Sequence, residues 1–153
     1  MAIGHTICAS FFLDLLQGVH DFRVDVFKMA FFEDDADLGP DTTAYSATNE
    51  CSGTAYPAGG FEITVPAGFP KLNDVAQGVA IGRIALVDFD NLDLKGLHIT
   101  TRGALVYNSS KSNKAVLVRN FGQAITLTGN RMIVAWPQPD VFSAIIKLSG
   151  IVE

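Results

Sequence analysis

Near the N-terminus, apolar residues recur every three to four positions, which is the spacing of an amphipathic helix. Thr6 stands before this stripe as a helix cap, and Gly18 follows it as a residue that commonly ends helices. The pattern therefore predicts a helix over about 6–17. Its apolar stripe consists of Ile7, Phe11, Phe12, Leu15 and Leu16.

After Gly18 the spacing changes to an alternation of apolar and polar residues, which is typical of a strand with one face in water. The alternation starts at residue 22 and gives way to a wholly apolar run that ends at residue 32. It predicts a strand over 22–32. Its buried face would hold Phe22, Val24 and Val26, and its solvated face Arg23 and Asp25.

From residue 61 onward, short apolar segments follow one another with turn residues between them. Gly129 and Asn130 accept positive φ, so they predict a tight hairpin between two of these segments. With 22–32 the count reaches eight or nine strands, which favours an all-β fold: an antiparallel β-sandwich of jelly-roll type with a short N-terminal helix. The further strands are expected at 61–65, 79–89, 97–101, 104–107, 115–121, 124–128, 132–136 and 142–148. The expected core includes Phe22, Val24, Val26, Leu86, Leu105, Val116, Val134 and Ile146.

Residues 33–60 are poor in large aliphatic side chains and rich in Asp, Thr, Ser, Gly and Pro. Such a composition predicts an irregular loop rather than strands. Tyr45 and Tyr56 favour a loop that packs as a cover over the core, with a short helical turn at 42–48.

The length of 153 residues is typical of one domain, so we expect 1–153 to form a single β-sandwich domain. The chain has 11 Lys and Arg against 16 Asp and Glu, a net charge of −5. This balance lacks the basic footprint of a nucleic-acid-binding protein, so no nucleic-acid partner is predicted. No apolar window approaches the roughly 20 residues of a membrane-spanning helix, and no membrane association is predicted. Residues 1–19 hold Asp14 and no Lys or Arg, so no signal peptide is expected.

The residues with reactive side chains form no recognisable catalytic motif. Cys8 and Cys51 have neither C-x-x-C spacing nor a nearby His, and we expect two free thiols, with one long-range disulfide as the alternative. His20 is interpreted as a turn residue bonded to the backbone, and His98 as a sheet residue, packed or half exposed. No catalytic, cofactor-binding or metal-ligating residue is predicted, and no cofactor.

Acidic residues gather in two places. Those within 33–37 favour a solvated loop, with weak divalent-cation binding as the alternative, because the ligand pattern of an EF-hand is missing. Those at Asp88, Asp90 and Asp93 are typical of a strand end followed by a turn. A hydrolase built on His20, Asp21 and the acidic loop is the least favoured function.

An interaction surface is the remaining hypothesis from the residues themselves. The chain contains 11 Phe, and its mean hydropathy is +0.28, so part of its apolar area is expected to face a partner. The N-terminal stripe and the loop at 33–60 are the expected contact regions.

Several long strings are similar, in the same order, to small virion proteins of tailed bacteriophages. They are LLQGVHDFRVDVFKMAFF, LGPDTTAYSATNECSGTAYPAGG, ALVDFDN, TTRGALVYNSSKSNKAVLVRNFGQ and a late strand ending in WP. They carry the patterns L-x-G-x-H-x-F, T-x-Y-x-A-T-x-E and R-G-A-L-x-Y-N. Residues 66–77 and Cys51 depart from the family pattern, so capsid-contacting loops are not carried over.

The resemblance implies a noncatalytic capsid decoration protein, also called a cement protein. It would be made in the host cytoplasm and sit on the capsid exterior of the virion. Its partners would be the major capsid protein and further copies of itself, as a dimer or trimer. The alternative is a tail or fibre component that binds carbohydrate, with Trp136 or Tyr107 as stacking platforms. For Trp136, a position in the core is the favoured interpretation.

Overall fold

The structure is a computed structural model that describes residues 2–77, 80–139 and 143–149. It is mostly β with one short helix, and each pair of named strands runs antiparallel. The chain order is β1 (Thr6–Ile7), α1 (Ala9–Leu16), β2 (Phe27–Phe32), β3 (Phe61–Ile63), β4 (Lys71–Gln77), β5 (Ala80–Val87), β6 (Leu92–Leu94), β7 (His98–Asn108), β8 (Lys114–Thr128), β9 (Met132–Val134) and β10 (Ile146–Ser149). The all-β prediction is therefore confirmed at the level of antiparallel sheets.

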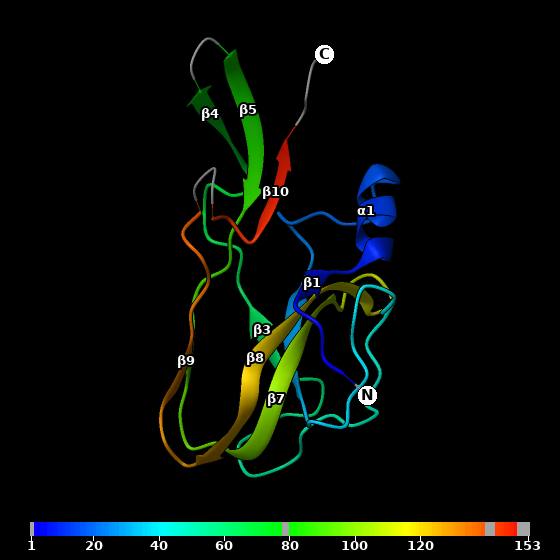
Figure 1. Ribbon diagram of the computed structural model, residues 1–153, viewed down its shortest axis with the longest axis vertical. Helices are drawn as coiled ribbons and strands as arrows, with labels where there is room; N and C mark the ends of the chain where they lie inside the picture. Colours follow the sequence, from blue (N-terminus) through cyan, green and yellow to red (C-terminus); the bar gives the residue numbers. More distant parts are fainter. Residues whose placement is uncertain (1, 78–79, 140–142, 150–153) are drawn as a thin grey trace.

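The largest sheet has the strand order β1-β8-β7-β2-β3 and is dominated by the long β7–β8 hairpin (Figure 1). The sequence predicted four strands here, at 97–101, 104–107, 115–121 and 124–128, but each pair is one strand. A register shift between Thr101 and Gly103 absorbs the irregularity without ending β7. A Cβ at Gly103 would lie 2.6 Å from the Arg119 carbonyl oxygen, so the close approach of the two backbones requires glycine there.

Two smaller sheets complete the fold, with orders β10-β5-β4 and β6-β9. Figure 1 shows β4, β5 and β10 extending from one end of the five-stranded sheet. The strands β4 and β6 were not predicted from the sequence. The predicted Gly129-Asn130 hairpin is also wrong, because β8 pairs with β7 whereas β9 pairs with β6. Gly129 does have positive φ, and its N–H donates to the Leu97 carbonyl at 2.7 Å.

The strand expected over 22–32 begins only at Phe27. Asp21 diverts the chain first: its carbonyl accepts the N–H groups of Val24 and Asp25, at 3.2 and 2.9 Å. This turn breaks the alternation, so Val24 and Val26 are 75% and 37% exposed instead of buried. The Asp25 side chain, which was expected in solvent, is only 5% exposed.

The helix begins at Ala9 rather than Thr6, because Thr6 and Ile7 pair with Val118 and Leu117 of β8. Cys8 occupies the N-cap position without a side-chain capping bond. The end of the helix agrees with the prediction, since Gln17 is the C-cap and Gly18 follows with φ +69°. In the described part of the chain, no helix combines the length and hydropathy needed to cross a bilayer.

The core lies against the five-stranded sheet and is rich in aromatic rings. Phe22 and Phe27 stack with centroids 4.6 Å apart, and Phe89 packs against both. The other predicted core residues apart from Val24 and Val26 are buried as expected: Phe22, Leu86, Leu105, Val116, Val134 and Ile146.

The loop at 33–60 packs as a cover, as predicted, although no helical turn forms at 42–48. The Tyr45 ring stacks on Tyr107 with centroids 4.6 Å apart. The Tyr56 hydroxyl accepts the N–H of Phe31 in β2 at 2.8 Å. These contacts tie the loop to the sheet without regular secondary structure.

Candidate interaction surface

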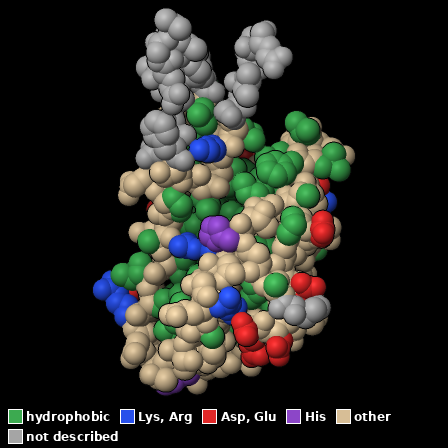
Figure 2. Space-filling view, in the orientation of Figure 1, with side chains coloured by type: hydrophobic (Ala, Val, Ile, Leu, Met, Phe, Trp, Pro, Cys, Tyr) green, Lys and Arg blue, Asp and Glu red, His purple; other side chains and the backbone are tan. Residues whose placement is uncertain are grey.

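Helix α1 exposes three large apolar side chains and buries an acid. Phe11 is fully buried and Asp14 is 4% exposed, both on the face toward the sheet. On the other face, Phe12, Leu13 and Leu16 are 47%, 57% and 89% exposed. These three residues are called the α1 face below. Figure 2 shows hydrophobic side chains gathered where Figure 1 places α1.

The usual arrangement of a surface helix is the reverse, with acids in water and apolar residues inside. Fully burying one Leu or Phe side chain contributes about 1.5 to 3 kcal/mol, and the free chain gains only part of this at the α1 face. A partner that covered these side chains would bury the area that remains exposed, and the complex would gain the corresponding free energy. The α1 face is therefore the candidate interaction surface, and the predicted N-terminal contact region coincides with it only through Phe12 and Leu16.

Asp14 is held inside by a basic side chain from the start of β8. Lys114 Nζ donates to Asp14 Oδ1 at 2.9 Å, and the Lys114 side chain remains 38% exposed. The second oxygen, Oδ2, lies 3.8 Å from His20 Nε2. Neither of these two atoms has a hydrogen-bond partner.

His20 continues the network toward β7. Its Nδ1 lies 2.9 Å from Nδ2 of Asn108, a fully buried residue at the end of β7. The same amide nitrogen donates to Asp25 Oδ2 at 2.7 Å, and Lys111 Nζ lies 3.7 Å from Asp25 Oδ1. The set formed by Asp14, His20, Asp25, Asn108, Lys111 and Lys114 is called the Asn108 cluster. The prediction that His20 bonds to the backbone is wrong, because its hydrogen-bond partner is the side chain of Asn108.

Burial and charge act in opposite directions on the titratable groups of the Asn108 cluster. Burial lowers the pKa of His20 and outweighs the carboxylates of Asp14 and Asp25, which raise it. For Asp25, burial raises the pKa, but the hydrogen bonds from the Asp21 backbone and from Asn108 lower it further. The cluster therefore favours a neutral imidazole beside two carboxylates.

A second, partly buried network organises the loop at 33–60 around Glu50. The hydroxyls of Tyr45 and Tyr56 donate to its two carboxylate oxygens at 2.6 and 2.8 Å, and the Gly59 N–H donates at 2.8 Å. Burial and the Glu50 carboxylate both raise the pKa of each tyrosine. Tyr45, Glu50, Tyr56 and Gly59 are called the Glu50 cluster. Tyr45 and Glu50 are the Tyr and Glu of the T-x-Y-x-A-T-x-E pattern, so this pattern has a structural explanation.

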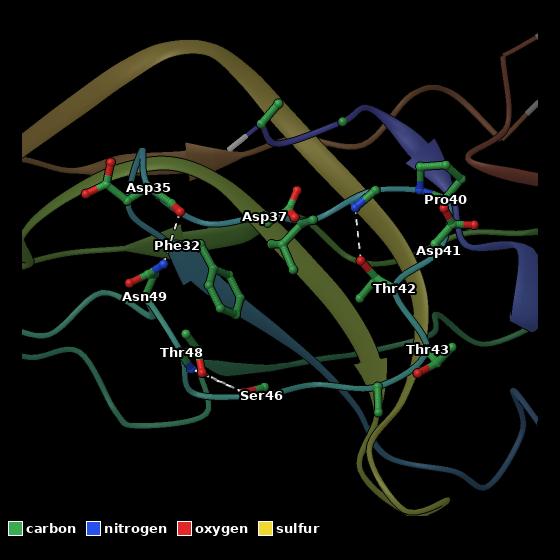
Figure 3. Close-up of a pocket in the computed structure, with 15 residues that line it drawn as sticks. Phe32, Asp35, Asp37, Pro40, Asp41, Thr42, Thr43, Ser46, Thr48 and Asn49 are labelled. Atoms are coloured by element: carbon green, nitrogen blue, oxygen red, sulfur yellow. Dashed lines mark hydrogen bonds between the residues drawn. The ribbon is translucent and has the colours of Figure 1, made fainter.

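A cavity of about 770 Å³ opens beside the acidic part of the same loop (Figure 3). Its lining includes Asp35, Asp37 and Asp41. The side chains of Asp35 and Asp37 are solvated, as predicted. The Asp35 backbone carbonyl accepts a hydrogen bond from Asn49 Nδ2, and Asp34 Oδ1 lies 3.5 Å from Arg102 Nε. Within 2–77, 80–139 and 143–149, no three His, Cys, Asp or Glu side chains are placed to hold a metal ion.

The two rings considered as sugar-stacking platforms are buried. Trp136 is 7% exposed, between Phe89 and the guanidinium of Arg119, and its Nε1–H donates to the Asp90 carbonyl at 3.1 Å. Tyr107 is 3% exposed and donates to the Gly59 carbonyl at 2.7 Å. Neither ring offers an open face to a sugar, and the interpretation of Trp136 as a core residue is confirmed.

The remaining candidate residues lie apart from one another. Cys8 and Cys51 are free thiols, as predicted. Both are buried, and burial raises the pKa of each thiol to about 11. His98 is exposed at the start of β7, and His5 accepts the N–H of Asn120 at 3.4 Å. The role of Asn108 was not predicted from the sequence. The single acid inside an apolar helix, Asp14, was nevertheless a signal of a buried partner.

Comparison of the chain with family models, with curated proteins and with solved structures found no match. The resemblance to tailed-phage virion proteins therefore stays a prediction.

Proposed function

We propose that this chain is a noncatalytic structural protein of a tailed-phage head, which decorates and stabilises the capsid by binding across neighbouring major capsid proteins. The observation that carries the proposal is the α1 face, where three large apolar side chains are exposed on a helix that buries its only charged residue. The ordered strings that resemble phage virion proteins supply the identity of the partner.

The proposed contact explains why a helix would be built in this way. Each bound copy would bury Phe12, Leu13 and Leu16 against the shell, and the same contact would recur at every equivalent position. A protein that binds the assembled lattice in preference to free subunits stabilises the lattice by mass action. We include self-association as a dimer or trimer on a local symmetry axis, because closed symmetric assemblies are the common case.

The finer description of the fold belongs to the same proposal. We propose that the antiparallel sheets form a sandwich of jelly-roll type, with the aromatic core around Phe22, Phe27 and Phe89 between its layers.

The first test locates the chain by cryo-electron microscopy of virions from the phage that encodes it. Density for this fold on the outer head surface, with α1 against the major capsid protein, supports the proposal. Density confined to the tail, or α1 pointing into solvent, overturns it.

The second test adds purified chain to heads that lack it and measures bound copies and the temperature at which the heads disrupt. The wild type should bind and raise that temperature, whereas the double variant Phe12→Ser, Leu16→Ser should do neither. Ile133→Ser is the matched control, because Ile133 is 51% exposed on β9, outside the α1 face. Equal binding by the double variant would remove the α1 face from the contact.

A further inference from the structure

The hydrogen bonds of the Asn108 cluster determine which nitrogen of His20 carries the proton. Ser110 N–H donates to Asn108 Oδ1 at 3.0 Å, which fixes the orientation of the amide. Its NH₂ group therefore faces both Asp25 Oδ2 and His20 Nδ1. Because both amide hydrogens are donated, His20 Nδ1 must accept, and the neutral ring carries its proton on Nε2.

That Nε2–H group faces Asp14 Oδ2 across 3.8 Å, too far for a direct hydrogen bond. Both groups are buried, with side-chain exposures of 0% for His20 and 6% for Asp14, and both atoms lack a partner. Unpartnered buried polar atoms are rare in folded proteins and call for a physical explanation. While the imidazole is neutral, the two groups form neither a hydrogen bond nor an ion pair across this gap.

We propose that His20 is an acid-sensitive switch that couples helix α1 to the sheet. A proton added to Nδ1 would place an N–H donor against the NH₂ of Asn108 and break that hydrogen bond. The imidazolium would then be drawn toward Asp14 Oδ2. Asp14 lies on α1 and His20 on the segment after it, so the movement acts directly on the element that carries the α1 face. The consequence for partner binding rests on the proposed function, whereas the switch itself does not.

The groups that face His20 from each neighbouring element set the direction of the response. Asp14 from α1 and Asp25 from the turn before β2 favour the imidazolium, while Lys114 of β8 and Lys111 of the β7–β8 turn oppose it. Burial has the largest effect on the His20 pKa and also opposes the imidazolium. The ring centroids of Phe11 and Phe27 lie 5.0 and 6.4 Å from the centroid of the imidazole. His20 is therefore neutral near pH 7 and charges only below its ordinary pKa of 6.5.

The experiment is an NMR titration of the full chain from pH 8 to pH 4, in which long-range ¹⁵N–¹H spectra report the tautomer of each histidine. We expect His20 to show Nε2–H at neutral pH and to titrate below pH 6.5, with the Asn108 side-chain amide shifting in the same step. A His20 pKa that is lowered in the folded chain means that protonation favours the locally open state of α1. Exchange of α1 amides, corrected for intrinsic rates, should therefore accelerate at acid pH, by about tenfold for each unit by which the His20 pKa is lowered. An Nδ1–H tautomer, a titration at or above pH 6.5, or unchanged α1 exchange would overturn the switch.

Two variants separate the switch from general acid effects. His20→Gln offers an amide oxygen to Asn108 and does not titrate, so it should abolish the acid step in α1 exchange. His98→Gln, at an exposed histidine of β7, is the matched control and should leave the step unchanged. If His20→Gln does not fold, the tautomer and pKa measured in the wild type still decide. Because the titration uses the isolated chain, its failure leaves the head-binding test unaffected, and failure to bind heads leaves the titration unaffected.

Discussion

The Glu50 cluster and the Asn108 cluster each enclose carboxylate groups, but they differ in how completely their polar atoms are bonded. Both oxygens of Glu50 accept hydrogen bonds, from two tyrosine hydroxyls and one backbone N–H. In the Asn108 cluster, Asp14 Oδ2 and His20 Nε2 are left without partners. Both networks therefore contain carboxylate groups, but only in the Glu50 cluster do both oxygens of the carboxylate have hydrogen-bond partners.

The difference shows what each arrangement is suited to. A fully bonded network fixes one conformation, because any movement leaves a buried donor or acceptor unpaired. An incompletely bonded network has a second bonding pattern within reach, since the 3.8 Å gap between Asp14 and His20 closes when the ring is charged. The Glu50 cluster holds the loop in place, and the Asn108 cluster leaves α1 responsive.

Among changes to the two clusters, the largest expected effect comes from removing the centre of the complete network. Glu50→Ala should lower the free energy of unfolding by about 3 kcal/mol, because it leaves two hydroxyls and one N–H without an acceptor. Chemical denaturation at pH 7 measures it. Glu62→Ala on β3 is the control, at an exposed carboxylate, and should change stability by less than about 0.5 kcal/mol. Equal losses in the two variants would show that Glu50 does not organise the loop.

The two clusters should fail at opposite ends of the pH scale. The pKa of Tyr45 and of Tyr56 is raised, so their contribution is complete below the unfolded value of 10 and is lost as pH rises beyond it. The pKa of His20 is lowered, so its contribution is complete above 6.5 and is lost as pH falls below it. Thermal unfolding across pH 4 to 12 should show both losses, and Tyr45→Phe should weaken only the alkaline one. An acid loss reduced by Tyr45→Phe would contradict the assignment.

A smaller effect is expected from neutralising the buried acid of α1. Asp14→Asn weakens the bond to Lys114 but keeps its shape, and Lys114 can turn to solvent, so the loss at pH 7 should be about 1 kcal/mol. The same variant removes the charge that raises the pKa of His20, so that pKa should fall further. NMR titration of the variant checks the direction. A higher His20 pKa in Asp14→Asn would show that the carboxylate does not act on the imidazole.

The smallest effect on stability is expected at the α1 face. Leu16 is 89% exposed, so Leu16→Ser should change the free energy of unfolding by less than about 0.5 kcal/mol. Denaturation with urea provides the measurement, and Phe11→Ala, at a fully buried position of the same helix, should cost about 3 to 5 kcal/mol. A loss in Leu16→Ser comparable to that in Phe11→Ala would mean that the α1 face is part of the chain's own core.

Periodicity predicted the elements whose patterns are local. The end of α1, the packed loop, most strand positions and most core residues follow from spacing and turn chemistry alone. The strand start at Phe27 did not, because the Asp21 turn depends on specific hydrogen bonds that alternation does not reveal. The bulge at Gly103 could not be distinguished from a strand break for the same reason.

The two clusters could not be predicted from the sequence because their members are far apart in the chain. Asn108 meets His20 across 88 positions, and Lys114 meets Asp14 across 100. No spacing rule connects residues at such separations, and only the topology that places β7 and β8 beside α1 brings them together. Asp14 in an apolar helix was the one local sign that such a partner existed.

The two free thiols supply a way to observe each region separately. Cys8 immediately precedes α1, and Cys51 immediately follows Glu50. Since the thiolate is the form that alkylating reagents attack, burial and a pKa of about 11 keep both sulfurs slow to react in the folded chain. Labelling followed by peptide mass spectrometry would then time the opening of each neighbourhood in the unmodified protein, with one natural reporter beside each cluster.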